Sequence, residues 1–309
     1  MNSPKLHGIL PVIPTPFDDE DQVDPAAIER VAQFCIDAGA HGLVFPGVAS
    51  EFDHLKPEEQ QQLLEVVCRI AHGRVPVICG GGNGDPENIG RFINRAHELG
   101  VVAAMVLIPK RFAGDTEGAL QYIQSIIELA PGVDIILQNA PAPVGAGLEA
   151  DELSKIISAC PAIRYVKEEA LPSGPRITAI NDAAPDHLIG VIGGGGARYL
   201  ISEMSRGALA AMPAAEITDL HVRMWNAFQA GDEAEARDLY TRTLPLLIIQ
   251  LLYRMRLTKY VLTRRGIFNN SNVRAPLPEF DAFDDAELVA QLDSLSDLFE
   301  IAPLKSVEA

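Results

Sequence analysis

A lysine and two glutamates, Lys167, Glu168 and Glu169, end a short apolar stretch near the middle of the chain. The stretch begins at Ile163 and has the β-branched and apolar composition of a buried strand. Side chains alternate between the faces of a strand, so we expect Lys167 and Glu169 on one face and Glu168 on the other. An amine beside a carboxylate can form an imine with a 2-keto acid while the carboxylate moves protons. The alternative is a strand that ends in a solvated cluster of charges.

Seven other apolar runs of strand-like length accompany this one along the first two thirds of the chain. Each is followed by a turn with Gly, Pro or Asn and then by a segment of helical periodicity. The eight expected strands are 8–15, 42–46, 75–79, 103–108, 134–139, 163–168, 188–192 and 208–212. The expected helices between them include 25–38, 57–72, 86–99, 118–129 and 150–159.

This alternation predicts an α/β fold, a (β/α)8 TIM barrel, because parallel strands are buried on both faces and form continuous apolar runs. A doubly wound open sheet is the alternative, but no GxGxxG follows the first strand. Beyond residue 212 only helical segments remain, near 217–230, 233–241 and 246–262. We therefore expect a barrel over residues 1–212 and a C-terminal helical extension over residues 213–309 that completes the barrel and is appended to it.

The overall composition restricts the classes of partner. A formal charge of −17 would repel nucleic acids and anionic membranes, so we expect neither as a partner. The four cysteines are widely separated, without a CxxC pair or a histidine spacing typical of zinc, so no metal is expected. Residues 1–9 do not resemble a signal peptide, and the longest apolar run, 244–253, is too short to span a bilayer. These features favour a cytoplasmic protein that binds a small molecule.

In such barrels the working residues come from the carboxyl ends of the strands. The second expected strand ends in a turn of small residues whose backbone N–H groups could bind a substrate carboxylate, namely Gly47, Val48, Ala49 and Ser50. A simple tight turn is the alternative. The fifth strand ends in two amides, Gln138 and Asn139, of which Asn139 is better explained as a structural amide. The glycines after the seventh strand, among them Gly194 and Gly195, indicate close approach of backbone to substrate or to a neighbouring side chain.

Together, the opening 8–17, the turn at 47–51, the step at 139–141, the lysine strand and the glycine-rich end of the seventh strand resemble the dihydrodipicolinate synthase and N-acetylneuraminate lyase family. The resemblance extends over nearly the whole chain. It implies a barrel with a C-terminal helical region, usually a homotetramer. It also implies a Schiff base between Lys167 and a pyruvate-like keto acid, without a cofactor.

Some positions depart from the pattern that the resemblance implies. Gln138 stands where members that make or break carbon–carbon bonds usually carry a tyrosine, and Val48-Ala49 replaces a pair of hydroxyl residues. Gln138 with Lys167 and Glu169 instead resembles the set in the branch that dehydrates L-2-keto-3-deoxyarabonate to 2,5-dioxopentanoate in pentose degradation. The resemblance therefore implies a lyase of the hydro-lyase type, with Lys167 as the nucleophile, Glu169 as the proton carrier and Gln138 orienting the leaving hydroxyl.

Three other functions stay open from the sequence. The same imine could serve a retro-aldolase of a 2-keto-3-deoxy sugar acid or a condensation like that of dihydrodipicolinate synthase, and a barrel without turnover could simply bind keto acids. The sequence does not fix the sugar acid, its C4 configuration or the oligomeric state. Candidates for contacts to the distal hydroxyls are Arg111, Ser173, Arg176 and Asn270.

Overall fold

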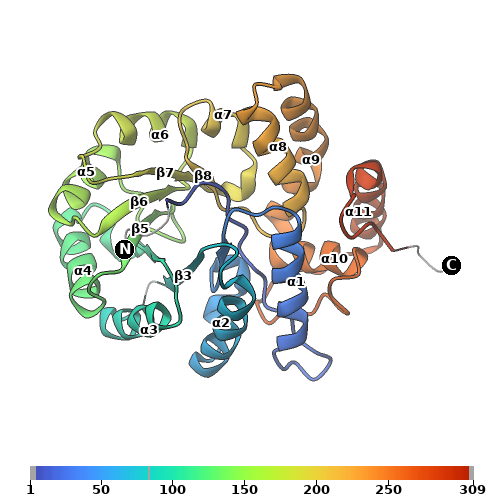
Figure 1. Ribbon diagram of the computed structural model, residues 1–309, viewed down its shortest axis with the longest axis horizontal. Coiled ribbons are helices and arrows are strands. Elements are labelled where there is room, and N and C mark those ends of the chain that lie inside the picture. Colours follow the sequence, from blue (N-terminus) through green and yellow to red (C-terminus); the bar gives the residue numbers. More distant parts are fainter. Residues whose placement is uncertain (1–4, 83, 306–309) are drawn as a thin grey trace.

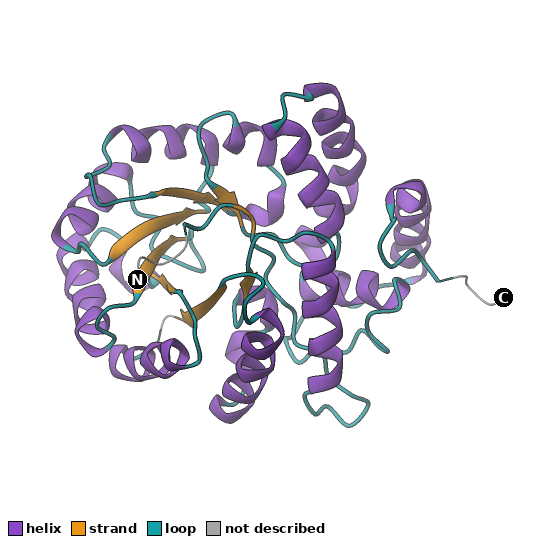
Figure 2. Ribbon diagram, in the orientation of Figure 1, coloured by secondary structure: helices purple, strands orange, loops and turns teal. Residues whose placement is uncertain are grey.

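The computed structural model describes residues 5–82 and 84–305. Its centre is a parallel sheet of eight strands surrounded by helices (Figures 1 and 2). The strands pair in the order β1-β8-β7-β6-β5-β4-β3-β2. They are β1 Gly8–Ile9, β2 Leu43–Val44, β3 Val77–Gly82, β4 Ala103–Leu107, β5 Asp134–Asn139, β6 Ile163–Glu168, β7 Gly190–Gly193 and β8 Ala210–Ala211. Val12, just beyond β1, forms parallel bridges to Val44 and to Ala214, which closes the sheet into a barrel.

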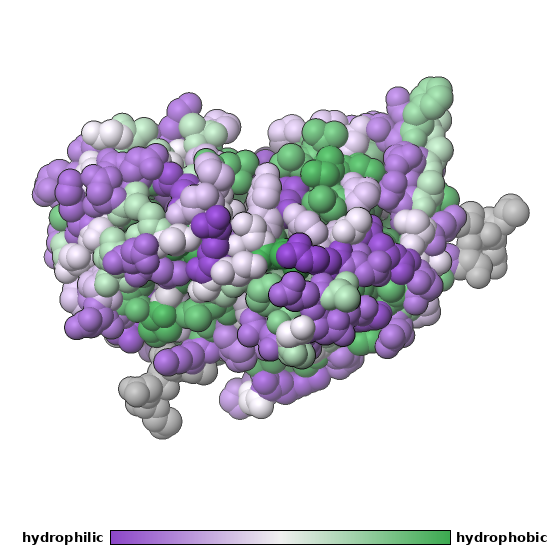
Figure 3. Space-filling model, turned by 90° about the horizontal axis from the view of Figure 1, so that it is seen from above, coloured by the Kyte–Doolittle hydropathy of each residue, from purple (hydrophilic) through white to green (hydrophobic). Residues whose placement is uncertain are grey.

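The helices that cover the barrel are α1 Pro25–Asp37, α2 Pro57–Ala71, α3 Pro86–Glu98, α4 Thr116–Leu129, α5 Ala150–Ala159, α6 Ser173–Asp182, α7 Leu200–Met204 and α8 Thr218–Gln229. Three of them begin with proline at the first position, where the missing N–H has no helical partner to lose. The helices α9 Glu233–Tyr253, α10 Met255–Arg264 and α11 Ala282–Leu295 follow. Among the described residues, no helix is both long and apolar enough to cross a bilayer. The face in Figure 3 mixes hydrophilic and apolar residues.

The predicted α/β barrel is confirmed, with some differences in its elements. The first strand is shorter than expected because Pro11 and Pro14 cannot donate to a β-ladder. The helix α6 was not predicted, since Gly174 and Pro175 lie in its first turn and weaken the helical signal. The expected interruption between 241 and 246 is wrong: α9 continues through Pro245, which removes one backbone donor, because Leu246 and its neighbour are fully packed. The division at residue 212 stays a prediction.

Alternate residues of β6 face opposite layers, and this sets the direction of Lys167. Tyr165 belongs to the apolar cluster inside the barrel, whereas Val166 belongs to the layer between sheet and helices. By alternation, Lys167 faces the interior and Glu168 faces the helices. Both are buried, with 5% and 0% of their surface exposed. The alternative of a solvated charge cluster is therefore wrong.

Candidate functional site

Lys167, Glu169 and Gln138 form one group, joined by an ion pair and a hydrogen bond, at the carboxyl ends of β5 and β6. The register of the two strands pairs Gln138 with Lys167. The Lys167 Nζ lies 3.0 Å from Glu169 Oε1, and Gln138 Nε2 donates to Glu169 Oε2 at 2.6 Å. The side chains of Lys167 and Glu169 are 6% and 20% exposed, so the pair is largely shielded from solvent. A carboxylate at this distance can exchange a proton with the amine, whereas a glutamine amide can only orient a partner.

A second group, behind the first, fixes the ends of the same two strands. The Glu168 carboxylate accepts from Asn139 Nδ2 at 2.9 Å and from the Ala170 N–H at 2.7 Å. The Arg176 Nε lies 3.4 Å from Glu168 Oε2. Burial raises the pKa of Glu168, although the hydrogen-bond donors and the Arg176 charge act to lower it. Asn139 also bonds both backbone groups of Leu148, so it is the structural amide that the sequence favoured.

The turn after β2 uses part of its own polar groups internally. The buried Ser50 hydroxyl donates to the Ile13 carbonyl at 2.5 Å and accepts from the Gly47 N–H at 2.9 Å. Ser50 and the Gly47 N–H therefore hold the shape of the turn and are not free for a ligand. The N–H groups of Val48 and Ala49 have no acceptor among the described residues, and both residues line the cavity at the barrel mouth.

The glycines after β7 make room for carboxylates. A Cβ on Gly194 would lie 2.3 Å from Glu169 Cγ, and one on Gly193 would lie 2.1 Å from Glu203 Oε2. Any larger residue at Gly194 would thus displace Glu169. The close approach predicted for Gly194 is to a neighbouring side chain, whereas Gly195 lines the cavity itself.

The cavity at the barrel mouth has two lobes. The lysine lobe, of about 350 Å³, is lined by Lys167, Glu169, Gly195 and Arg198, among others. The glutamine lobe, of about 420 Å³, includes Gly47 and Gln138. The two lobes share five lining residues, which are Val48, Met105, Val144, Arg254 and Met255. The predicted site residues therefore border these two adjoining lobes, except Ser50 and Gly194, which do not line either lobe.

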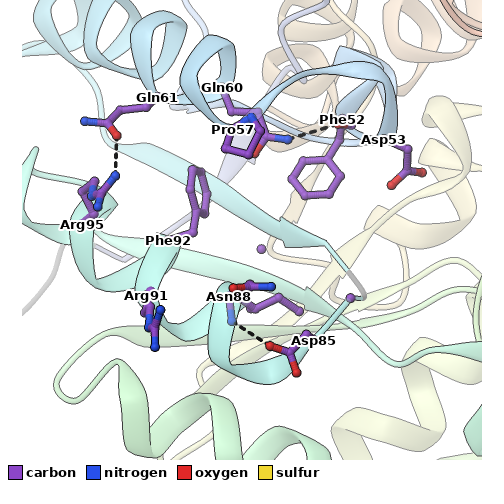
Figure 4. A pocket seen from close by; sticks show the side chains of 13 residues that line it. Phe52, Asp53, Pro57, Gln60, Gln61, Asp85, Asn88, Arg91, Phe92 and Arg95 are labelled. Atoms are coloured by element: carbon purple, nitrogen blue, oxygen red, sulfur yellow. Dashed lines mark hydrogen bonds between the residues drawn. The ribbon is translucent and has the colours of Figure 1, made fainter.

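A larger cavity, of about 480 Å³, lies between α2 and α3 (Figure 4). Its polar side chains mostly bond to one another or to backbone: Arg95 donates to Gln61 at 2.6 Å, and Gln60 donates to the Phe52 carbonyl at 3.2 Å. No lysine lines this cavity within the described chain. The amine chemistry therefore belongs to the barrel mouth.

Sequence reasoning missed a buried ion pair next to the site. Lys259 of α10 and Glu51, which follows the turn, are both fully buried, with Nζ 2.5 Å from Oε1. Lys259 also donates a hydrogen bond to the Asn272 carbonyl. Glu51 Oε2 accepts hydrogen bonds from the backbone N–H groups of Arg274 and Ala275. Burial lowers the pKa of Lys259 to about 8, although the Glu51 charge opposes this. The pair ties the C-terminal region to the turn, and Ala275 lines the glutamine lobe.

We expect Lys259→Met to lower the free energy of unfolding by roughly 3 kcal/mol, because it leaves the Glu51 charge buried without its partner. Urea denaturation of wild type and variant at neutral pH measures this difference. The double variant Lys259→Met/Glu51→Gln, which removes both charges, should lose less than the single one. A single variant as stable as wild type would show that the pair contributes nothing.

Glu203 of α7 is a second carboxyl that the sequence did not single out. Its Oε1 accepts from the Ser173 hydroxyl at 2.7 Å, and its Oε2 is buried with no partner among the described residues. Burial raises the pKa of Glu203 to about 7, and the charges of Glu169 and Glu168 add to the rise. The folded protein therefore holds this proton more tightly than the unfolded chain does.

This shift predicts a pH-dependent stability. Because the pKa of Glu203 rises from 4.5 to about 7 on folding, its contribution is fully present below pH 4.5 and is lost as the pH rises through 7. The change corresponds to roughly 3 kcal/mol. Relative to wild type, Glu203→Gln should therefore gain stability between pH 5 and pH 8 in urea titrations. The exposed control Glu98→Gln should show no such gain, and an equal pH trend in all three proteins would contradict the assignment.

The fold and site together define a (β/α)8-barrel protein with a shielded amine–carboxylate pair at the end of its sixth strand. The chain belongs to the dihydrodipicolinate synthetase family, which it matches over residues 5–295. The family resemblance predicted from the sequence is thus confirmed.

Relatives in the family carry out different reactions. The chain is 28% identical to an L-2-keto-3-deoxyarabonate dehydratase of Azospirillum brasilense, over 94% of each chain. It is 26% identical to a 4-hydroxy-tetrahydrodipicolinate synthase of Methanosphaerula palustris, over 94% of this chain and 99% of the relative. Both names, dehydratase and synthase, describe enzymes of the lyase class.

Solved structures support the fold. A dihydrodipicolinate synthase from Rhodopseudomonas palustris superposes with a TM-score of 0.87 at 24% identity, covering 94% of this chain and 98% of the other. A sialic acid aldolase from Ruminococcus gnavus gives 0.85 at 20% identity, covering 94% and 97%. At these identities the likeness concerns the barrel and not the substrate.

Proposed function

We propose that the protein is a hydro-lyase that dehydrates a 2-keto-3-deoxy sugar acid through a Schiff base on Lys167. The first substrate to test is L-2-keto-3-deoxyarabonate, with 2,5-dioxopentanoate as the product. The observation that carries the proposal is the contact of Glu169 with both Lys167 Nζ and Gln138 Nε2. It supplies a nucleophile and a proton carrier, with a neutral amide as the third member. The dehydratase of Azospirillum brasilense, similar over 94% of the chain, supports the same choice.

The first half of the reaction forms an enamine. The neutral Lys167 amine attacks C2 of the keto acid. The carboxylate of the keto acid accepts hydrogen bonds from the N–H groups of Val48 and Ala49. The C2 oxygen takes one proton from the amine and a second carried by Glu169, and it leaves as water. The iminium cation that remains makes the C3 protons acidic. Glu169, 3.0 Å from Nζ, takes one C3 proton, and the electron pair moves to form the enamine.

The second half expels the C4 hydroxyl. Glu169, now protonated, gives its proton to the leaving oxygen while Gln138 orients that hydroxyl. The enamine electrons return to form a conjugated iminium as water departs. A proton then leaves C5 and one is added at C3, which gives an enol and restores the iminium. The enol tautomerises to an aldehyde, and water attacks C2 to release the dioxo acid and the free Lys167.

The amide at Gln138 favours dehydration over carbon–carbon cleavage. Cleavage to pyruvate needs a base that removes the C4 hydroxyl proton, and a glutamine amide does not act as one. The same lack argues against a condensation of the dihydrodipicolinate synthase type. A barrel that only binds keto acids has no need of the carboxylate placed beside the amine.

The test is a product analysis with a panel of 2-keto-3-deoxy pentonates and hexonates. Formation of a semialdehyde, detected with an NADP-linked dehydrogenase, supports dehydration. Free pyruvate, detected with lactate dehydrogenase, would instead make the protein an aldolase. Thermal stabilisation by a sugar acid that is never consumed would make it a binding protein.

For assembly and location we propose a cytoplasmic homotetramer. The support is the family resemblance for the tetramer, and the charge of −17 for a location away from anionic surfaces. Sedimentation velocity at micromolar concentration distinguishes a tetramer from a dimer or monomer by mass.

A further inference from the structure

Arg254, which separates α9 from α10, has a strained backbone beside the cavity. Its φ and ψ are 48° and −122°, where a Cβ is unfavourable and glycine is the usual residue. Both neighbouring helices hold it there: its N–H donates to the Gln250 carbonyl at 2.7 Å, and its carbonyl accepts from the Thr258 N–H at 3.2 Å. Strain of this kind is kept where the surrounding structure fixes it, and it is concentrated at functional sites.

Arg254 is also placed between the two lobes of the cavity. It is one of the five residues that line both the lysine lobe and the glutamine lobe, and among those five only Arg254 is charged. The lysine lobe it shares with Lys167 and Glu169 has a volume of only about 350 Å³. A sugar acid bound to Lys167 through C2 would therefore occupy a small lobe that Arg254 also borders.

The side chain of Arg254 makes no ion pair or hydrogen bond among the described residues, although the chain has 42 aspartates and glutamates against 25 lysines and arginines. Arg198, on the same lobe, is different: it donates to the Leu247 carbonyl and to Gln250 Oε1 at 3.2 and 2.9 Å. Arg198 thus secures the end of α9, including Gln250, which in turn bonds the Arg254 N–H. The Arg254 guanidinium is exposed at the cavity, and its donors have no partner among the described residues.

A guanidinium has five donors and no acceptor, so its partner must present oxygen acceptors. On the basis of the proposed function, we infer that Arg254 is a specificity-determining residue that donates hydrogen bonds to the distal hydroxyl oxygens of the sugar acid. The substrate carboxylate is assigned, as above, to the Val48 and Ala49 N–H groups, so the Arg254 donors are left for the hydroxyl oxygens. Arg254 then selects hydroxylated keto acids over pyruvate, which has no distal hydroxyl oxygen to accept its hydrogen bonds.

The test compares two keto acids on the whole protein. Borohydride trapping on Lys167 is measured against the concentration of pyruvate and of L-2-keto-3-deoxyarabonate, for wild type, Arg254→Met and Arg254→Gly. We expect the half-saturating concentration of the sugar acid to rise roughly 10- to 100-fold in both variants, as for loss of a charged hydrogen bond. The half-saturating concentration of pyruvate should change less than about twofold, because pyruvate makes no hydrogen bond to Arg254 that the substitution could remove.

Two variants separate the side chain from its backbone. Arg254→Gly removes the strain together with the guanidinium, whereas Arg254→Met keeps the strain, so a substrate contact predicts the same selective loss in both. The control Arg237→Met removes an exposed arginine from the preceding helix, α9, and should behave as wild type.

The outcomes separate this inference from the proposed function. An equal loss for pyruvate and sugar acid, or no change for the sugar acid, would overturn the role of Arg254 while the Schiff base stands. If the sugar acid is trapped but not dehydrated, the proposed reaction fails, and selective loss in the variants still supports the contact. If wild type traps no keto acid, both the proposed function and the role of Arg254 are contradicted.

Discussion

Replacing Lys167 with alanine is expected to abolish the trapping of keto acid on the protein by borohydride and to bring turnover below detection. The imine needs a primary amine at the end of β6, and Lys167 is the lysine there. Lys259, the other buried lysine of the described chain, already bonds Glu51 and the Asn272 carbonyl and cannot replace it. Intact mass spectrometry after reduction measures the adduct directly.

The control for this experiment is Lys155→Ala, which removes an exposed lysine paired with Asp151 at 3.9 Å. That variant should keep both the adduct and the turnover of wild type. Circular dichroism and urea unfolding show whether Lys167→Ala is folded, and Lys167→Met, closer in volume, serves as a second folded variant. Stoichiometric labelling of a folded Lys167 variant would place the nucleophile on another residue.

The barrel could be predicted because its signals are local. Each strand from β3 to β6 has five or six residues and contains a short apolar stretch, and helix starts such as Pro25 and Pro86 are visible in the sequence. The alternation of side chains along β6 was enough to place Lys167 and Glu169 on one face, and their contact at 3.0 Å agrees with it. The short helix α7 has too few residues to give a periodic signal.

Contacts between distant segments could not be predicted. Glu51 and Lys259 are 208 positions apart, and nothing around either residue indicates the other. The bond between Gln138 and Glu169 depends on the register of β5 against β6, which shifts between Ile135 and Ile136. The strain at Arg254 arises because two packed helices meet there, although arginine itself gives no sign of a left-handed backbone.

The turn after β2 shows a further limit. The small residues correctly suggested backbone donors at the cavity, but the sequence could not tell which N–H groups are used internally. The Ser50 hydroxyl bonds the Gly47 N–H because the Ile13 carbonyl, from another strand end, fixes its direction. Only the folded chain shows that the N–H groups of Val48 and Ala49, two residues that line the cavity, have no acceptor among the described residues.

Replacing Glu169 with glutamine is expected to slow dehydration by about two to four orders of magnitude while the imine still forms. Glutamine keeps the size of the side chain and its ability to bond Gln138, but it cannot accept the C3 proton or return it to the leaving hydroxyl. Borohydride adducts should therefore persist in the variant, which distinguishes a lost proton carrier from a lost nucleophile. The control is Glu149→Gln, an exposed carboxyl that is 69% accessible and pairs with Arg176.

A direct measurement of the same proton transfer is the exchange of the pyruvate methyl protons in D2O, followed by NMR. Pyruvate forms the iminium but has no C4 hydroxyl, so exchange reports only the removal and return of a C3 proton. Wild type and Glu149→Gln should exchange the methyl protons, and Glu169→Gln should do so slower by about the same two to four orders of magnitude as its dehydration. Rapid exchange combined with slow dehydration would leave Glu169 as the acid for the C4 hydroxyl alone, and the C3 base would have to be sought elsewhere in the lysine lobe.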